Sequence, residues 1–378
     1  MKRRKGRERS ILRGCLLSAF FLAGAAVLLS QNGDWLRAVQ PRAWKFPEDH
    51  GSHPGFRTEW WYFTGNLADA AGAKYGYELT FFRQGVQFAP VNAENPWSVR
   101  DLYLAHFTVT DSSRGGFRAE DLLSRAGPGL AGARTGQIDI WLLDWSAKMR
   151  EGAILLSARK NGLELSLQLK PRKPVVLHGA NGFSRKGEAE GEASYYASLT
   201  DLETQGTIFL AKSGPPIAVA GTSWFDHEFS SNMLAKDQVG WDWFSLHLSD
   251  GRDLMVYLMR RADGSVGAAS SGTLVERDGA TRHLARSDLI MNVTDHWRSP
   301  KSDGNYPSRW RIAIAAAGID LVITPLLADQ ELVAAGLPGL VYWEGTVAGE
   351  GISGGRPIKA EGYVELTGYA GNLRSILK

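Results

Sequence analysis

The sequence predicts an all-β protein made of two barrels or sandwiches, and three observations support this. Runs of Trp, Tyr and Phe such as Trp60 to Phe63 favour extended backbone, where flat side chains cover a pleated sheet. Thirteen Trp and 43 Gly indicate aromatic strands joined by glycine turns. The same pattern of strands also recurs later in the chain, which predicts two related units.

Size and charge limit the possible functions. The 378 residues exceed one ordinary core, and 44% hydrophobic with 22% charged residues is a globular composition. The net charge is only +3, and the basic excess is concentrated in the first 13 residues. No basic surface is indicated, so we expect no nucleic-acid partner.

The amino terminus predicts export. The basic run Met1 to Arg9 precedes an apolar run from Cys15 to Ser30, as in a signal peptide or a short membrane anchor, and we assign residues 1–34 to this segment. Cys15 is the sole cysteine, so the exported part has no disulfide. We therefore expect a periplasmic or secreted protein, either free or held at the inner membrane by this segment.

The first half of the chain reads as a series of strands. Tyr77, Leu79 and Phe81 alternate with other side chains, as in a half-buried strand. Lys160-Asn161-Gly162 is a hairpin turn. Residues 119–136, rich in Gly, Ala and Arg, read as a long loop or a short helix. The predicted strands are residues 60–69, 75–83, 102–110, 137–145, 153–159 and 163–169.

An internal repeat sets the predicted domains. Residues 60–69 align with residues 241–250, and the ends of the two units match as well. We therefore predict domains at residues 44–234 and 235–378, of ordinary domain size. Because an up-and-down barrel pairs its first strand with its last, residues 59–67 should lie beside residues 221–229.

That pairing would gather ionisable and aromatic residues at one barrel end. Alternation places Trp224, Asp226 and Glu228 on one face of their strand, with Phe225, His227 and Phe229 on the other. Buried charges must be paired or hydrogen-bonded. The predicted counter-ions are Arg57, Arg83 and Arg260.

Two interpretations of this cluster remain open. Aromatic walls would raise a carboxyl pKa and keep a general acid protonated. Alternatively, the cluster is a structural set of salt bridges that closes the barrel, and the Trp residues are core. A metal site would need His53, His106 and His227 with carboxylates, but no short HxH or HxxxH spacing supports one, so we expect neither a metal nor a cofactor. GxSxG, P-loop, Rossmann and HExxH motifs are absent from the sequence.

Several long segments resemble the AttH-like family, a lipocalin-like superfamily that includes the carotenoid 1,2-hydratases. The resemblance covers about residues 46–370 and implies two lipocalin-like β domains. The matching segments are His53-Pro54-Gly55-Phe56-Arg57-Thr58-Glu59-Trp60-Trp61-Tyr62, Leu104-Ala105-His106-Phe107, Trp224-Phe225-Asp226-His227-Glu228, Gly240-Trp241-Asp242-Trp243-Phe244, Tyr342-Trp343-Glu344-Gly345 and Gly362-Tyr363-Val364-Glu365-Leu366-Thr367-Gly368-Tyr369.

The resemblance also implies candidate functions. Members of the family are typically exported and accompany an ABC transporter with a lipid- or lipoprotein-type permease. The hydratase branch adds water to a terminal isoprenoid double bond without a cofactor. His227 and Phe229 match its first motif and Tyr257 its tyrosine, whereas Met259 stands where the donor acid is expected. Asp226, Glu228 or Asp242 would have to replace that acid.

Our first hypothesis is therefore an exported lipocalin-like protein that binds a lipophilic molecule and assists an ABC transporter permease at the inner membrane. The alternative is a cofactor-independent hydratase or hydrolase that uses Asp226, His227, Glu228 and Tyr257. The binding hypothesis predicts that Asp226 and Glu228 are paired to arginines away from any pocket, and the enzyme hypothesis predicts at least one beside a cavity. The predicted ligand-binding residues are His53, Glu59, Trp60, Trp61, Tyr62, Arg83, His106, Trp224, Trp241, Asp242, Trp243, Trp343 and Glu344.

Overall fold

The structure is a computed structural model that describes residues 34–89, 94–95, 97–210, 215–231 and 234–371. The predicted export signal or anchor at residues 1–34 lies outside the described residues, apart from Asp34. Among the described residues, no helix has the length and apolar character needed to cross a membrane.

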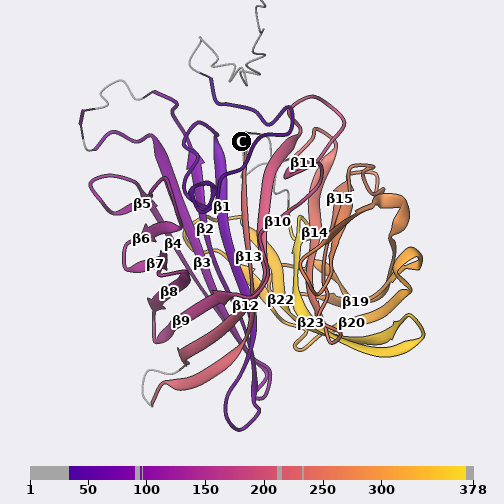
Figure 1. Ribbon diagram of the computed structural model, residues 1–378. Helices are drawn as coiled ribbons and strands as arrows, with labels where there is room; N and C mark the ends of the chain where they lie inside the picture. Colours follow the sequence, from indigo (N-terminus) through magenta and orange to yellow (C-terminus); the bar gives the residue numbers. More distant parts are fainter. Residues whose placement is uncertain (1–33, 90–93, 96, 211–214, 232–233, 372–378) are drawn as a thin grey trace, which may run out of the picture.

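The amino-terminal part of the chain folds into one strongly curled antiparallel sheet, drawn in indigo and magenta in Figure 1. Its strands follow the order β4-β3-β2-β1-β13-β12-β9-β8-β7-β6-β5, and β10 and β11 pair with β12. The strands are β1 (Thr58–Ala68), β2 (Lys74–Gly85), β3 (Asp101–Asp111), β4 (Gly116–Arg125), β5 (Ala131–Ala133), β6 (Asp139–Leu142), β7 (Trp145–Arg150), β8 (Ala153–Lys160), β9 (Leu163–Pro171), β10 (Val176–Leu177), β11 (Phe183–Arg185), β12 (Ala193–Phe209) and β13 (Ile217–Ser230).

The carboxy-terminal part forms a second curled antiparallel sheet, orange to yellow in Figure 1. Its order is β17-β16-β15-β14-β23-β22-β20-β19-β18, and β21 pairs with β22. Three short 3-10 helices complete the described elements: Glu48–His50, Arg286–Asp288 and Ala315–Ala317. The strands are β14 (Gln238–Leu248), β15 (Asp253–Arg261), β16 (Ser271–Val275), β17 (Thr281–Ala285), β18 (Ile290–Arg298), β19 (Asn305–Ile314), β20 (Ile319–Pro325), β21 (Glu331–Val333), β22 (Val341–Ser353) and β23 (Arg356–Thr367).

The two sheets share a plan in which the first strand pairs with the last. β1 lies between β2 and β13, and β14 lies between β15 and β23. The register of β1 and β13 places Trp60 opposite Glu228 and Tyr62 opposite Asp226. The predicted pairing of residues 59–67 with residues 221–229 is therefore confirmed, as is the all-β class. The β1–β13 pair lies in the middle of the first sheet, whose end strands are β4 and β5. The first sheet curls into a near-barrel and the second into a half-barrel.

Two local predictions are wrong and one is confirmed. The predicted strand at residues 137–145 is interrupted by a turn, since β6 ends at Leu142 and β7 begins at Trp145. Residues 119–136 are not a loop or a helix, since β4 and β5 occupy most of this range. β4 pairs with β3 at the end of the sheet, and Asp121 is its one buried residue, so no alternation shows in its sequence. The Asn161-Gly162 turn is as predicted, with positive φ at both residues, as a two-residue hairpin between β8 and β9 requires.

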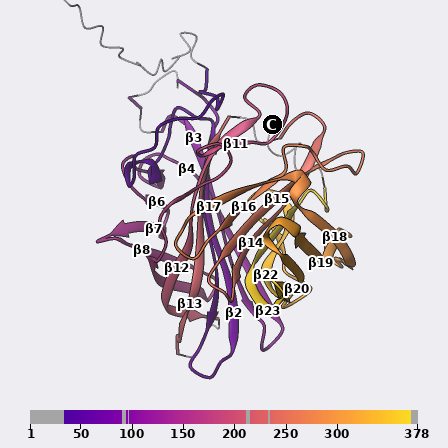
Figure 2. The same ribbon diagram turned by 45° about the vertical axis from the view of Figure 1, so that its right-hand side comes forward.

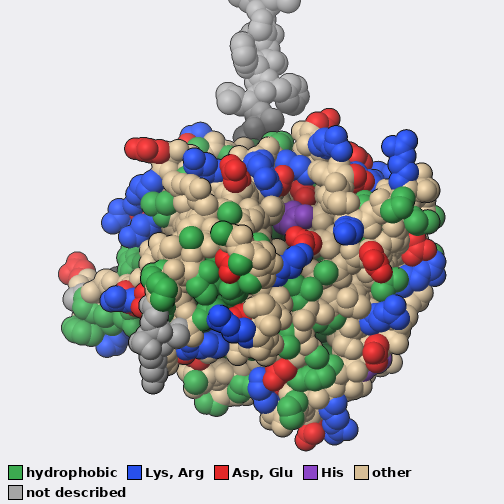
Figure 3. All heavy atoms as spheres, turned by 90° about the horizontal axis from the view of Figure 1, so that it is seen from below, with side chains coloured by type: hydrophobic (Ala, Val, Ile, Leu, Met, Phe, Trp, Pro, Cys, Tyr) green, Lys and Arg blue, Asp and Glu red, His purple; other side chains and the backbone are tan. Residues whose placement is uncertain are grey.

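Each sheet encloses its own apolar core, and a third cluster lies between the sheets. This third cluster contains aromatic and methionine side chains from β1, β12 and β13 of one sheet and β14, β15 and β23 of the other: Tyr62, Tyr196, Trp224, Trp243, Met255, Tyr257, Met259 and Tyr363. Between the sheets, β23 packs against β1 and β22 against β2, and Figure 2 shows the two sheets side by side. In the view of Figure 3, charges of both signs are interspersed over the surface with apolar patches between them.

Candidate active site

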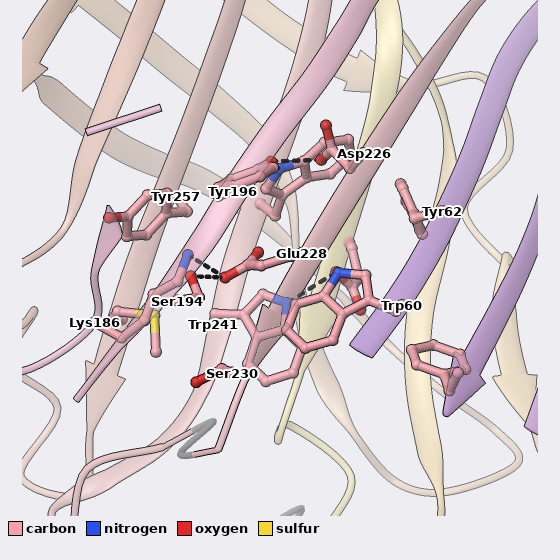
Figure 4. Close-up of a pocket in the computed structure, with 14 residues that line it drawn as sticks. Trp60, Tyr62, Lys186, Ser194, Tyr196, Asp226, Glu228, Ser230, Trp241 and Tyr257 are labelled. Atoms are coloured by element: carbon pink, nitrogen blue, oxygen red, sulfur yellow. Dashed lines mark hydrogen bonds and ion pairs between the residues drawn. The ribbon is translucent and has the colours of Figure 1, made fainter. Parts of the chain in front are cut away.

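A pocket of about 70 Å3 lies within the cluster between the two sheets, and we call it the acid pocket. Two aromatic pairs at equivalent positions of the repeat form its walls: Trp60 and Tyr62 on β1, and Trp241 and Trp243 on β14. Figure 4 shows Asp226 and Glu228 on β13 among these rings. The full lining is Trp60, Tyr62, Phe82, Lys186, Ser194, Tyr196, Asp226, Glu228, Ser230, Trp241, Trp243, Tyr257, Met259 and Glu365.

Asp226 on β13 has a raised pKa. Its side chain is 3% exposed, and burial raises its pKa to about 7, although three donors favour the charged form. The donors are the Tyr196 hydroxyl, the Ser198 hydroxyl and the Trp224 indole N–H, the last at 2.6 Å. Among the described residues Asp226 forms no ion pair, so its carboxyl is partly protonated near neutral pH.

A chain of hydrogen bonds runs outward from Asp226. Burial lowers the pKa of His178 to about 3, so its ring is neutral. Ser198 donates to Asp226 and must therefore accept from His178 Nε2, at 2.7 Å, which leaves Nδ1 to accept from Thr273 at 2.9 Å. This chain fixes the ring and the Ser198 hydroxyl, and it holds the Asp226 carboxyl in one orientation.

Tyr196 connects Asp226 to the aromatic wall of the pocket. Its hydroxyl donates to Asp226 Oδ2 and accepts from Trp243 Nε1 at 3.0 Å. When Asp226 is protonated, its O–H can donate to the tyrosine oxygen, and the Tyr196 proton is then free to turn toward the pocket. Burial and the nearby carboxyls raise the pKa of Tyr196, so the phenol stays protonated.

Glu228 has a different environment from Asp226. Lys186 Nζ lies 2.9 Å from Glu228 Oε1, and the Ser194 hydroxyl donates to the same oxygen. The Lys186 ammonium also lies over the Tyr257 ring, 4.1 Å from its centroid. Despite the opposing effect of burial, Glu228 helps raise the pKa of Lys186, so this pair is charged. The pocket therefore places a partly protonated acid beside an ion pair.

Three further pocket residues come from the second sheet. Glu365 on β23 accepts a hydrogen bond from Trp241 Nε1 at 2.8 Å, and burial raises its pKa to about 7. Tyr257 donates from its hydroxyl to the carbonyl of Arg185 at 2.8 Å, which ties the pocket wall to the segment that carries Lys186. Met259 lines the pocket, but its thioether has no proton to donate.

The opposite face of β1 and β13 carries a second polar cluster. Glu59 is fully buried and bonds to His227 Nε2 at 2.9 Å, His53 Nδ1 at 3.0 Å and Arg83 Nε at 3.1 Å. Glu59, His53 and His227 lie within 4.8 Å of one another, a spacing that could hold a metal ion. The Glu59 carboxylate oxygens and the ring nitrogens of His53 and His227 already have hydrogen-bond partners. We therefore infer that the cluster holds the segment before β1 in place. That no metal is bound stays a prediction.

The predicted ligand-binding residues thus divide into groups. Trp60, Tyr62, Trp241 and Trp243 line the acid pocket, and Trp224 packs behind it and donates to Asp226. Of the predicted catalytic residues, Asp226, Glu228 and Tyr257 line it, whereas His227 faces the other side, where its ring stacks on Trp61.

The remaining predicted residues lie elsewhere. Asp242 is paired with Arg260 at 2.7 Å, and Tyr62 donates to Glu344 deep between the sheets. Trp343 is core in the second sheet. His106 and Arg83 line a neighbouring cavity instead. Of the predicted counter-ions, Arg83 pairs with Glu59 and Arg260 with Asp242, but the partner of Glu228 is Lys186.

Sequence reasoning missed several residues of this site: His178, Lys186, Ser194, Tyr196 and Glu365. Two of these residues carried a signal in the sequence: Tyr196 belongs to the Tyr195-Tyr196 pair of the repeat, and Glu365 to the Gly362 to Tyr369 segment that resembles the AttH-like family. Lys186 lies between β11 and β12, in a segment without strand periodicity.

The comparisons agree with this architecture. The sequence profile of the AttH-like family matches residues 37–369. The chain belongs to the AttH-like family. A solved structure from Nitrosomonas europaea, assigned as AttH, is 36% identical with a TM-score of 0.78, and the match covers 88% of this chain and 99% of that one. The lipocalin-like fold is therefore shared.

A second solved structure has the same fold at lower identity. Kievitone hydratase from Nectria haematococca is 15% identical with a TM-score of 0.66, and the match covers 87% of this chain and 94% of that one. At this identity the likeness concerns the fold alone. A search of curated proteins found no significant match.

Proposed function

We propose that this AttH-like protein adds water to a carbon–carbon double bond of a lipophilic substrate, or forms such a bond by removing water from an alcohol, with Asp226 as the acid and no cofactor. The observation that carries the proposal is the position of Asp226: its carboxyl is buried, partly protonated near pH 7 and in the wall of an aromatic pocket. The binding hypothesis predicted arginine partners away from any pocket, and neither Asp226 nor Glu228 pairs with an arginine among the described residues.

The chemistry of hydration follows from the residues in the pocket. Asp226 gives up its proton directly, or Tyr196 gives up its own and takes the proton of Asp226. The π electrons of the alkene form the new C–H bond at the less substituted carbon. The neighbouring carbon becomes a tertiary cation. The faces of Trp60, Trp241 and Trp243 would stabilise that charge as cation–π partners.

Water then completes the reaction. Its oxygen forms the C–O bond to the cation and its surplus proton returns to the Asp226 carboxylate, so the acid is regenerated. Glu228, charged and held by Lys186, is placed to accept a hydrogen bond from this water and orient it. The reverse sequence would remove water.

The fold supports the proposal as well, since kievitone hydratase shares it. The role beside an ABC transporter and the periplasmic or secreted location stay predictions from the sequence.

The test is isotopic. Purified protein would be incubated with farnesol, whose terminal double bond is trisubstituted, in water enriched in oxygen-18, and the products analysed by mass spectrometry. We expect a tertiary alcohol that carries one oxygen-18, absent with Asp226→Asn. If a panel of lipids with trisubstituted double bonds gives no product, or Asp226→Asn gives as much as the wild type, the proposal is wrong.

A further inference from the structure

Buried oxygens without a hydrogen bond gather in one layer between the two sheets. Nine buried side-chain atoms of the described residues have no hydrogen-bond partner, and five of these atoms are oxygens of Thr64, Glu78, Thr80 and Glu344. We call these four residues the oxygen cluster, and each of their side chains is at most 1% exposed. Folded proteins leave few buried polar groups unpaired, and such a group often marks a bound ion or water.

Three members of the oxygen cluster lie on the face of the first sheet that is turned toward the second sheet. Leu79 belongs to the apolar core of the first sheet, so Glu78 and Thr80, its two neighbours on β2, face the other way. Thr64 on β1 lies directly opposite Glu78 in the register of the two strands. These three side chains therefore share one face over two adjacent strands.

Contacts between the sheets place Glu344 of β22 across from Glu78. The Tyr62 hydroxyl on β1 donates to Glu344 Oε1, which leaves Glu344 Oε2 without a partner. Gly76 packs on Thr346, whose Cβ lies 2.6 Å from the position of a Cβ at residue 76. Glu78 is two residues from Gly76 on the same face of β2. Glu344 is likewise two residues from Thr346 on the same face of β22, so the two carboxyls face each other.

The oxygen cluster holds two carboxyls but no positive charge. Neither Glu78 nor Glu344 pairs with a lysine, arginine or histidine of the described residues, and the charged groups that act on Glu344 are Glu78 and Glu365. Burial raises the pKa of Glu78 to about 8, although the Thr80 hydroxyl lies nearby, outside hydrogen-bond geometry, and favours the charged form. The cluster therefore offers five oxygens to a shared positive charge.

We propose that the oxygen cluster binds one calcium ion between the two sheets. Ca²⁺ takes roughly six to eight oxygen ligands at about 2.3–2.6 Å and tolerates irregular geometry, whereas Mg²⁺ demands a near-ideal octahedron. Oxygens that share a Ca²⁺ ion lie roughly 3.4 Å or more apart, too far for a good hydrogen bond, which accounts for unbonded oxygens that face one another. Because Glu344 belongs to the second sheet and the other ligands to the first, the ion would hold the sheets together.

This site is separate from the acid pocket and from the histidine cluster around Glu59. None of its four residues lines the acid pocket, so the inference does not depend on the proposed function. Its ligands come from three strands of two sheets, and no spacing in the sequence could predict them. The expectation that the protein holds no metal rests on histidine spacing and does not concern a site made of oxygens.

Calcium binding can be measured on the whole protein after treatment with a chelator. Isothermal titration calorimetry should show one site per chain with a Kd on the order of 10⁻⁴ M, as in extracellular calcium modules.

Saturating Ca²⁺ should also raise the Tm by several degrees, because the ion binds only the folded protein with its sheets docked. If Ca²⁺ up to about 10 mM gives neither heat of binding nor a shift in Tm, the cluster is satisfied by protons or water alone and the inference is wrong.

Glu78→Gln locates the ion, because it removes one charge and keeps the shape of the side chain. We expect it to weaken Ca²⁺ binding about tenfold or more. The matched control is Glu203→Gln at an exposed position of β12, which should bind Ca²⁺ as the wild type does. Thr64→Val removes one hydroxyl ligand instead and serves as a second measurement should Glu78→Gln fail to fold, with binding weakened by about threefold or more. Either variant binding Ca²⁺ as tightly as the wild type would place the ion elsewhere and overturn the inference.

Discussion

Asp226→Asn has two consequences that follow from the same buried carboxyl. The first concerns rate. A positioned general acid contributes typically 10²–10⁴-fold, about 3–5 kcal/mol of the barrier, and asparagine cannot supply the proton. We expect kcat to fall by that factor with little change in KM. The control is Asp278→Asn, at an exposed turn between β16 and β17, which should leave turnover unchanged.

The second consequence concerns stability, and its sign follows from the raised pKa. The pKa of Asp226 is about 7 in the folded protein against 3.8 for an unperturbed aspartate, so the folded state holds the proton more tightly. Its contribution to stability is therefore fully present below pH 4 and is lost as the pH rises through 7. A difference of about three pKa units corresponds to on the order of 4 kcal/mol.

Chemical denaturation of the wild type and Asp226→Asn from pH 4 to pH 8 measures this term. Asparagine does not titrate, so the variant should gain on the order of 4 kcal/mol relative to the wild type across that range. Taking the difference between the two proteins removes the titration of all other groups. A difference that stays flat between pH 5 and pH 8 would refute the claim that folding raises the pKa of this carboxyl to about 7.

Three further substitutions test other parts of the structure. Lys186→Met leaves Glu228 buried without its cation and should cost about 3 kcal/mol, seen as a lower Tm, so an unchanged Tm would count against the buried ion pair. His178→Phe removes the N–H that Ser198 accepts, which weakens the Ser198 hydrogen bond to Asp226 and raises the pKa of Asp226 further. The upper pH limit of activity should therefore move to higher pH with KM unchanged. A change in KM alone would contradict the positioning role. Gly76→Val brings a side chain against Thr346, whose Cβ lies 2.6 Å from the position of a Cβ at residue 76. The Tm should fall by several degrees because the two sheets must separate to make room. A Tm equal to that of the wild type would show that the sheets are loosely packed here.

The pairing that organises the site could be predicted from the sequence. The repeat identified β1 and β13 as the first and last strands of one unit, and alternation then placed Asp226 and Glu228 on the face opposite His227. These inferences need only the order of the strands and the alternation of side chains between the two faces of a strand. Both can be read from the sequence pattern.

The rest of the site depends on how the two sheets dock. Glu365 reaches the pocket because β23 packs near β1, and the sequence pattern of β23 does not show which strand of the other sheet it faces. Lys186 comes from a segment without periodicity, so the cation expected for Glu228 was sought among the arginines of the strands instead. His227 is a predicted catalytic residue because it matches the first motif of the hydratase branch, although alternation turns its side chain away from Asp226 and Glu228.

The protonation of Asp226 can be observed directly by carbon-13 NMR of protein labelled at the aspartate carboxyl carbons. The signal that disappears in Asp226→Asn identifies the residue. We predict that this signal titrates with a midpoint near pH 7. A midpoint near pH 4 would mean that the carboxyl is charged at neutral pH, and Asp226 could not then serve as the acid of this pocket.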